Sequence, residues 1–156
     1  MMTKMLKVLV LGGLITTAPA IYAHLDSDEF MQSYRQSFFA LLGGTFGHMA
    51  AMAKGEIPWD SAAFQQRANN IAALVTINVT RSFPEDSDKG TTRAKPDIWS
   101  NKADFEAKFD DMVAAVGDLQ RVAATGDESA MKKQLGDTGG TCKACHDEYK
   151  SKDYLY

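Results

Sequence analysis

The chain has 156 residues, 45% of them hydrophobic, and a formal net charge of −3. It is long enough for one domain with a single buried core. The acidic balance argues against a nucleic-acid partner, because binding to the phosphate backbone needs a basic surface.

Residues 1–23 have the three parts of a secretory signal peptide: two lysines, an apolar run at 8–15, and small residues that place cleavage after Ala23 or Ala20. A membrane anchor is the alternative, but the run is well short of the about 20 residues that span a bilayer. Cleavage removes two lysines and no carboxylate, so the mature net charge becomes −5. We therefore predict a periplasmic protein, one domain over 24–156, without a membrane segment.

Two helices are predicted next, because apolar side chains recur at steps of three, four and seven residues. The first begins near Asp26 or Ser27, either of which can cap a helix, and ends at 54–55. Its predicted buried stripe is Phe30, Tyr34, Phe38, Leu42, Met49 and Met52. The second begins at Asp60 and fades through β-branched residues near Thr80. Its stripe is Phe64, Ala68, Ile71 and Val75.

The second half of the chain predicts a long connection and two more helices. Residues 81–99 contain two prolines, a glycine and many charges without a period, which is typical of a surface connection. A third helix runs from 100–101 to 125–126, and a fourth begins at 127–128. The stripe of the third helix is Phe105, Phe109, Met112, Val116 and Leu119, and the fourth carries Met131, Leu135, Cys142, Cys145, His146 and Tyr149. Two glycines at 139–140 in the fourth predict a kink or the close approach of a bulky group. Four amphipathic helices predict an all-α, antiparallel four-helix bundle.

The strongest chemical signal is Cys-Lys-Ala-Cys-His, in which Cys142 and Cys145 are followed by His146. On a helix, this spacing brings all three side chains to about one face. Cys-x-x-Cys-His attaches c-type haem, and histidine is a common ligand of haem iron. A disulfide across so short a loop would stabilise little, zinc needs four ligands, and a thioredoxin-like dithiol needs alternating strands. We predict one covalent haem c near the C-terminus, with His146 as the metal ligand.

The spacing alone leaves the second axial position of the iron open. A Met or His ligand is typical of electron carriers, whereas a vacant position lets the iron bind a small molecule. The candidates in the mature chain are Met31, Met49, Met52, Met112, Met131, His24 and His48. Most of the methionines lie in or beside the apolar stripes, where packing in the core is their ordinary role.

Several short segments add a more specific signal than the haem motif. They are Tyr-Arg-Gln-Ser at 34–37, Phe-Gly-His-Met at 46–49, Lys-Gly at 54–55, Pro-Asp-Ile-Trp-Ser at 96–100 and Cys-Lys-Ala-Cys-His-Asp-Glu-Tyr at 142–149. In these segments the chain resembles the cytochrome c′ family, which are four-helix-bundle cytochromes with haem near the C-terminus. The resemblance covers essentially the whole mature chain.

The resemblance implies roles for further residues. In the family the iron is typically five-coordinate, and an apolar side chain of the first helix covers the side opposite the proximal histidine. By position that side chain is Phe39 here, whereas low-spin members carry a Met ligand on that helix. The resemblance also places Arg35 near a haem propionate, and Lys150 beside the proximal imidazole where the family usually has arginine. Lysine keeps the charge but lacks the planar fork.

Three functions are compatible with a haem c in a four-helix bundle. The resemblance implies a five-coordinate haem protein that binds NO and CO, carries electrons, or does both, and that forms a homodimer through its first two helices. The alternative is a six-coordinate, low-spin electron-transfer cytochrome with Met ligation and a redox protein partner. A peroxidase or reductase would need acid–base residues on the distal side. None is evident near Phe39, so we predict no enzyme activity.

Overall fold

The computed structural model describes residues 28–155 of the chain. The predicted signal peptide and the predicted helix caps Asp26 and Ser27 lie outside the described residues. The long helices are α1 (Phe30–Lys54), α2 (Ser61–Leu74), α4 (Lys102–Ala123) and α5 (Glu128–Tyr149). Between α2 and α4 lie a short 3₁₀ helix, η1 (Val79–Ser82), and a single turn, α3 (Asp97–Ser100).

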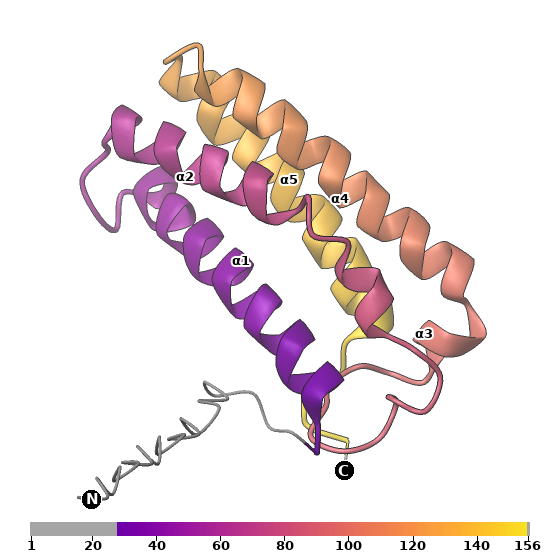
Figure 1. Ribbon diagram of the computed structural model, residues 1–156. Coiled ribbons are helices and arrows are strands. Elements are labelled where there is room, and N and C mark those ends of the chain that lie inside the picture. Colours follow the sequence, from indigo (N-terminus) through magenta and orange to yellow (C-terminus); the bar gives the residue numbers. More distant parts are fainter. Residues whose placement is uncertain (1–27, 156) are drawn as a thin grey trace, which may run out of the picture.

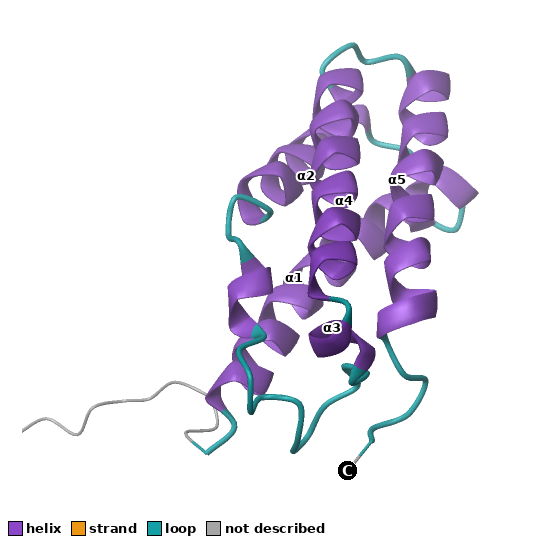
Figure 2. Ribbon diagram, turned by 90° about the vertical axis from the view of Figure 1, so that its right-hand side faces the viewer, coloured by secondary structure: helices purple, strands orange, loops and turns teal. Residues whose placement is uncertain are grey.

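The four long helices pack side by side as an antiparallel bundle (Figure 1). The α1–α2 and α4–α5 turns lie at one end, and η1, α3 and the C-terminal segment gather at the other (Figures 1 and 2). The predicted all-α four-helix bundle is therefore confirmed. Within residues 28–155, none of the helices combines the length and the apolar composition that a membrane crossing requires.

Local sequence signals explain where the helices begin and end. The carboxylate of Asp60 accepts a hydrogen bond from Ala63 N at 2.9 Å, and that of Asp127 accepts one from Ala130 N at 3.0 Å. Both are side-chain caps at a helix N-terminus. Gly55 and Gly126 each adopt φ +74° just past a helix, a conformation that costs glycine little.

The predicted stripes of the last three long helices are confirmed. All of their predicted apolar members in α2 and α4 are buried: Phe64, Ala68, Ile71, Phe105, Phe109, Met112, Val116 and Leu119. In α5, Met131 and Leu135 are buried as well. The second helix ends at Leu74 rather than near Thr80, because the β-branched run from Val75 leaves the helix and closes into η1.

The predicted stripe of α1 is right in its second half and wrong in its first. Phe30 and Tyr34 are exposed, at 48% and 36%. The side chains that face inward there are polar, namely Gln32 and Arg35, which are both buried. A hydrophobic period cannot detect this arrangement, because the inner face of α1 at this end packs against a polar connection instead of an apolar core.

The connection at 81–99, predicted to be a surface segment, is instead partly built into the fold. Its residues Ser82, Phe83, Ser87, Thr92 and Ile98 are buried. Side chains of α1 hold it along its length: Gln32 Nε2 donates to Lys89 O at 2.8 Å, and Gln36 Nε2 donates to Thr91 O at 2.6 Å. These contacts give its polar groups the partners that burial requires.

Arg35 is the centre of this attachment. Nη1 donates to Ser82 O at 3.3 Å and to Ser87 Oγ at 3.1 Å, while Nη2 donates to Ser87 O at 2.7 Å and to Thr92 Oγ1 at 3.1 Å. The guanidinium also lies 4.7 Å from the centre of the Phe83 ring, a cation–π distance. Burial lowers the pKa of Arg35 to about 10, and Asp88 partly opposes that shift. The side chain therefore stays charged at neutral pH.

Removing this side chain has a testable cost. Arg35→Ala leaves the buried acceptors of the connection without donors and opens a cavity, so we expect the free energy of unfolding to fall by about 3 kcal/mol in denaturant titrations. Arg121→Ala is the matched control, because its side chain is 74% exposed in a surface pair with Asp118 and should change stability by less than about 1 kcal/mol. Equal losses in the two variants would contradict a structural role for Arg35.

Candidate functional site

A cavity of about 640 Å³ opens between α1, α4, α5 and the connection. This volume lies within the range of small-molecule and cofactor sites. Its walls are mostly apolar and include Phe39, Leu42 and Phe46 of α1 and Phe105, Phe109 and Met112 of α4.

The α5 wall of the cavity carries the whole Cys-x-x-Cys-His motif. Cys142, Cys145 and His146 all line the cavity, and both cysteines are free and half-buried. Burial raises the pKa of Cys142, and raises that of Cys145 to about 11. At neutral pH both are therefore neutral thiols, directed into an apolar space.

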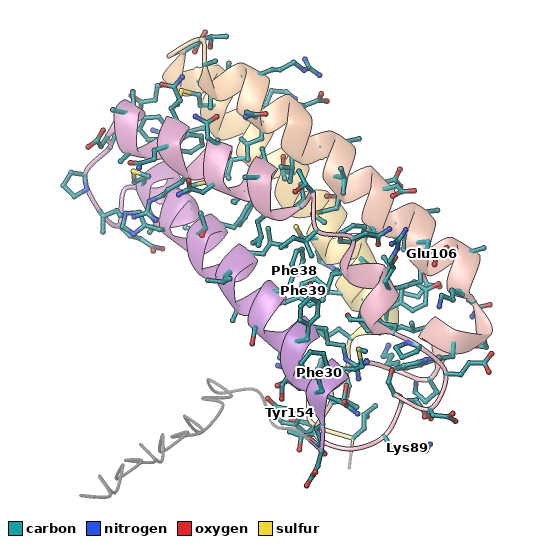
Figure 3. All side chains as sticks on the ribbon, viewed as in Figure 1. Phe30, Phe38, Phe39, Lys89, Glu106 and Tyr154 are labelled. Atoms are coloured by element: carbon teal, nitrogen blue, oxygen red, sulfur yellow. The ribbon has the colours of Figure 1, made fainter. Side chains whose placement is uncertain are left out.

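His146 and Phe39 approach each other across this cavity from two different helices. Their ring centres lie 6.5 Å apart with the planes at 68°. Figure 3 shows Phe38 and Phe39 on the inner side of α1, toward the other helices. Partial burial, followed by the positive charges of Lys150 and Arg93, lowers the pKa of His146. The imidazole is thus neutral at pH 7 and can donate a lone pair.

Positive charge gathers around the cavity although the chain as a whole is acidic. Four cationic side chains line it, Arg35, Arg93, Lys108 and Lys150, and no carboxylate belongs to the lining. Lys108 forms an ion pair at 3.3 Å with Glu148, which does not line the cavity. Arg93 Nε donates to Ser151 O at 2.9 Å. An apolar slot with a cationic edge suits a flat apolar group that carries carboxylates.

Comparison with known proteins identifies the family. The family model described as Cytochrome C′ matches residues 31–150. The cytochrome c′ of Rubrivivax gelatinosus is 42% identical over 120 residues, which cover 76% of this chain and 92% of the relative. The chain belongs to the cytochrome c′ family.

Solved structures of cytochrome c′ agree with the fold. The protein from Shewanella frigidimarina matches with a TM-score of 0.74 and 41% identity, over 78% of this chain and 94% of that one. The nitric oxide complex of a variant from Alcaligenes xylosoxidans matches with a TM-score of 0.72 and 32% identity, over 80% and 96%.

Members of the cytochrome c′ family bind haem c covalently, so the predicted cofactor is confirmed, and Cys142 and Cys145 stand in the motif that attaches it. The site fits this group on its own chemistry. Two free thiols lie three residues apart on one wall of an apolar cavity, an imidazole lies beside them, and cations line the edge. Thiols, imidazole and cations match the vinyl groups, the iron and the propionates.

Lys150 lines the cavity although it lies outside α5, so its position does not follow from the helical spacing after His146. The α5 helix ends at Tyr149, and Lys150 is in an extended conformation, φ −118° and ψ 125°, bridged to Ala94 of the connection. Backbone hydrogen bonds on both sides, Lys95 N to Tyr149 O at 3.0 Å and Ser151 N to Arg93 O at 2.7 Å, hold the segment there. Lys150 therefore stays near His146 because the connection holds it.

Few of the candidates for a second axial ligand of the iron line the cavity. Of the methionines and histidines proposed from the sequence within the described residues, Met112 is the one that lines the cavity. Met49, Met52 and Met131 are buried in the core away from it, and His48 is exposed. His24 lies outside the described residues.

Sequence reasoning missed several residues of the cavity wall. Phe83 and Arg93 come from the connection that was read as a surface segment, and Tyr154 comes from the C-terminal tail. Phe46 was part of a family signal without an assigned role. Its spacing was a usable signal, because Phe46 lies seven residues after Phe39 and so on the same face of α1.

Tyr149 gives the site a testable dependence on pH. Its hydroxyl donates to Asp104 Oδ2 at 2.5 Å, and burial together with this hydrogen bond raises the pKa of Tyr149 above its ordinary value near 10. The unfolded chain loses this proton near pH 10 while the folded chain keeps it, so stability falls as pH rises above 10. Between pH 9 and 11 the wild type should lose about 1.4 kcal/mol more than Tyr149→Phe. Parallel pH profiles of unfolding would contradict this assignment.

Proposed function

We propose that this protein is an exported, five-coordinate haem c protein that binds NO and CO at a vacant iron position beneath Phe39. The observation that carries the proposal is the chemistry of the α1 wall. Besides Arg35, its lining residues are Gln36, Phe39, Ala40, Leu42, Gly43 and Phe46, and none of them is a usual ligand of haem iron. A haem held from α5 would meet only this wall on its other side.

Each residue has a defined part in this proposal. Cys142 and Cys145 fix the haem, His146 is the proximal ligand, and Phe39 covers the opposite side and excludes water. The bound haem c supplies an iron that accepts a diatomic ligand or an electron. Gln36 is the polar neighbour of Phe39, one turn away, and its Nε2 donates one of its two hydrogens to Thr91 O at 2.6 Å, which ties the amide to the connection. Apart from Arg35, the other α1 lining residues near Phe39 are apolar, which favours NO and CO over a polar O₂ adduct.

The cations of the cavity are assigned to the edge of the haem. We propose Arg35 as a partner of a haem propionate, supported by the charges of Arg93 and Lys150, which line the same cavity without a carboxylate among the lining residues. Lys150 is also proposed as the charged neighbour of the proximal His146, in agreement with its effect on the pKa of that residue.

Two further parts of the proposal come from outside the cavity. The signal sequence at 1–23 supports export and cleavage, hence a periplasmic location. A relative from Alcaligenes xylosoxidans was solved as a nitric oxide complex of a variant, which supports NO as a ligand for this chain too. The α1 wall near Phe39 has no acid–base pair, so we assign no catalytic residue.

Electron transfer with a six-coordinate, low-spin iron is the second candidate, and one observation favours it. Met112 lines the cavity and is 5% exposed, so its thioether is already inside the site. This candidate implies a redox protein partner and an iron indifferent to gases. Met112→Leu separates the two, because it leaves a five-coordinate spectrum unchanged but converts a Met-ligated low-spin spectrum to high spin.

The vacant iron position is tested by optical spectroscopy of the purified holoprotein. We expect a high-spin ferrous spectrum that shifts on addition of NO or CO. Phe39→Ala removes the cover and should speed CO association by about tenfold or more, since a missing side chain in an apolar pocket changes access on that scale. A low-spin spectrum that ignores both gases would refute the proposal, and an unchanged CO rate would refute the role of Phe39.

The exposed apolar residues of the first two helices support a homodimer. Leu41 is 62% exposed and lies seven residues after the exposed Tyr34, and so on the same face of α1. Ile77, just after α2, is 41% exposed and lines a surface pocket with Phe30 and Tyr34. We propose that a second copy of the chain covers this face, because apolar groups that gather on one surface mark an interface.

A charge on this face should separate the subunits. Leu41→Glu is expected to convert the dimer to monomer in analytical ultracentrifugation, since burying an unpaired carboxylate is costly. Ala107→Glu, at an exposed position of α4, is the control and should leave the sedimentation coefficient unchanged. A wild-type monomer would contradict the proposed dimer.

A further inference from the structure

The helices α1 and α5 run antiparallel, and their facing residues pair in a regular register. Phe39 lies opposite His146, with the ring centres 6.5 Å apart. Seven residues further along α1, Phe46 lies opposite Gly139, which is seven residues earlier in α5. Seven residues span about 10.5 Å of a helix, so the two pairs mark two levels of one interface.

At the second level, the ring of Phe46 lies against the backbone of Gly139. A Cβ added at Gly139 would lie 3.3 Å from Phe46 Cζ and 3.7 Å from Phe46 Cε1. Gly140, the next residue, meets nothing within 4 Å, and the same is true of the other helical glycines that the structure describes. The close approach predicted from the two glycines is therefore confirmed at Gly139, and the bulky group is the Phe46 ring.

The space between the two levels belongs to the cavity. Gly43 lies between Phe39 and Phe46 on α1, lines the cavity, and leaves open space where a side chain would stand. Phe46 lines the cavity as well, one turn of α5 beyond the Cys142 level. The α1 side thus offers room that begins at Phe39, passes over Gly43 and stops at the ring of Phe46.

We infer that Phe46, seated against Gly139, is the end wall of the ligand side of the haem and limits the iron to short ligands. The inference rests on the proposed gas-binding function. A diatomic ligand fits beneath Phe39, whereas the tail of a longer ligand that extends along α1, over Gly43, meets Phe46. Gly139 acts by position, because any larger side chain there displaces the ring.

Ligand size gives the direct test. The holoprotein is titrated in its ferrous form with CO and with n-butyl isocyanide, whose four-carbon tail is the probe of the end wall. Phe46→Ala should raise the affinity for n-butyl isocyanide by about tenfold or more while the affinity for CO changes by less than about threefold, because added apolar space favours the tail alone. Phe46→Leu, a smaller change that keeps the core filled, should give the same direction.

A stability cycle tests the contact without any ligand. Alanine favours a helix over glycine, so Gly140→Ala should raise the denaturation midpoint of the holoprotein by about 3 °C. Gly139→Ala should lower the midpoint in the presence of Phe46, and should raise it like Gly140→Ala in a Phe46→Ala background. A merely structural ring would give this cycle too, so the isocyanide-to-CO ratio decides the role.

The outcomes keep the two proposals apart. If the wild type binds neither CO nor isocyanide, the vacant iron position is wrong and the size limit is lost with it. If the wild type binds CO and the ratio does not change in Phe46→Ala and Phe46→Leu, the size limit is overturned while gas binding stands. Equal effects of Gly139→Ala and Gly140→Ala in the presence of Phe46 would overturn the contact itself.

Discussion

The structure depends on one buried charge, the guanidinium of Arg35. It takes the place of an apolar side chain on the inner face of α1 and offers its donors to Ser82, Ser87 and Thr92. A long connection with little apolar content is thereby fixed against the bundle, and the ring of Phe83 beneath the guanidinium becomes a wall of the cavity. The cofactor site is therefore shaped by a polar network as much as by packing.

The site combines an apolar interior with a cationic edge, and both properties come from separate parts of the chain. The interior comes from the long helices, whose aromatic side chains face the cavity. Two of the four cations at the edge, Arg93 and Lys150, come from the connection and the end of α5, where backbone pairing holds them. Lys150 lies beyond the end of α5, yet its charge helps to lower the pKa of His146.

The helical stripes of α2, α4 and α5 and the haem motif could be read from the sequence, because spacing in a helix fixes which residues share a face. The first half of α1 could not. Its apolar residues Phe30 and Tyr34 point outward while Arg35 points inward, and the partners that make this favourable lie 47 or more residues away. The contact of Gly139 was predicted, but its partner Phe46 required the register of two helices.

The bundle is unequal along its length. Toward the α1–α2 and α4–α5 turns it is filled by its own side chains, among them Met49, Phe64, Leu119 and Met131, all fully buried. Toward α3 it surrounds the cavity, and the core there is a smaller cluster of Phe83, Ile98, Phe105 and Tyr149. Before the haem is attached, that end should therefore be the less stable one, and amide hydrogens of the haem-free chain should exchange there while the other end stays protected.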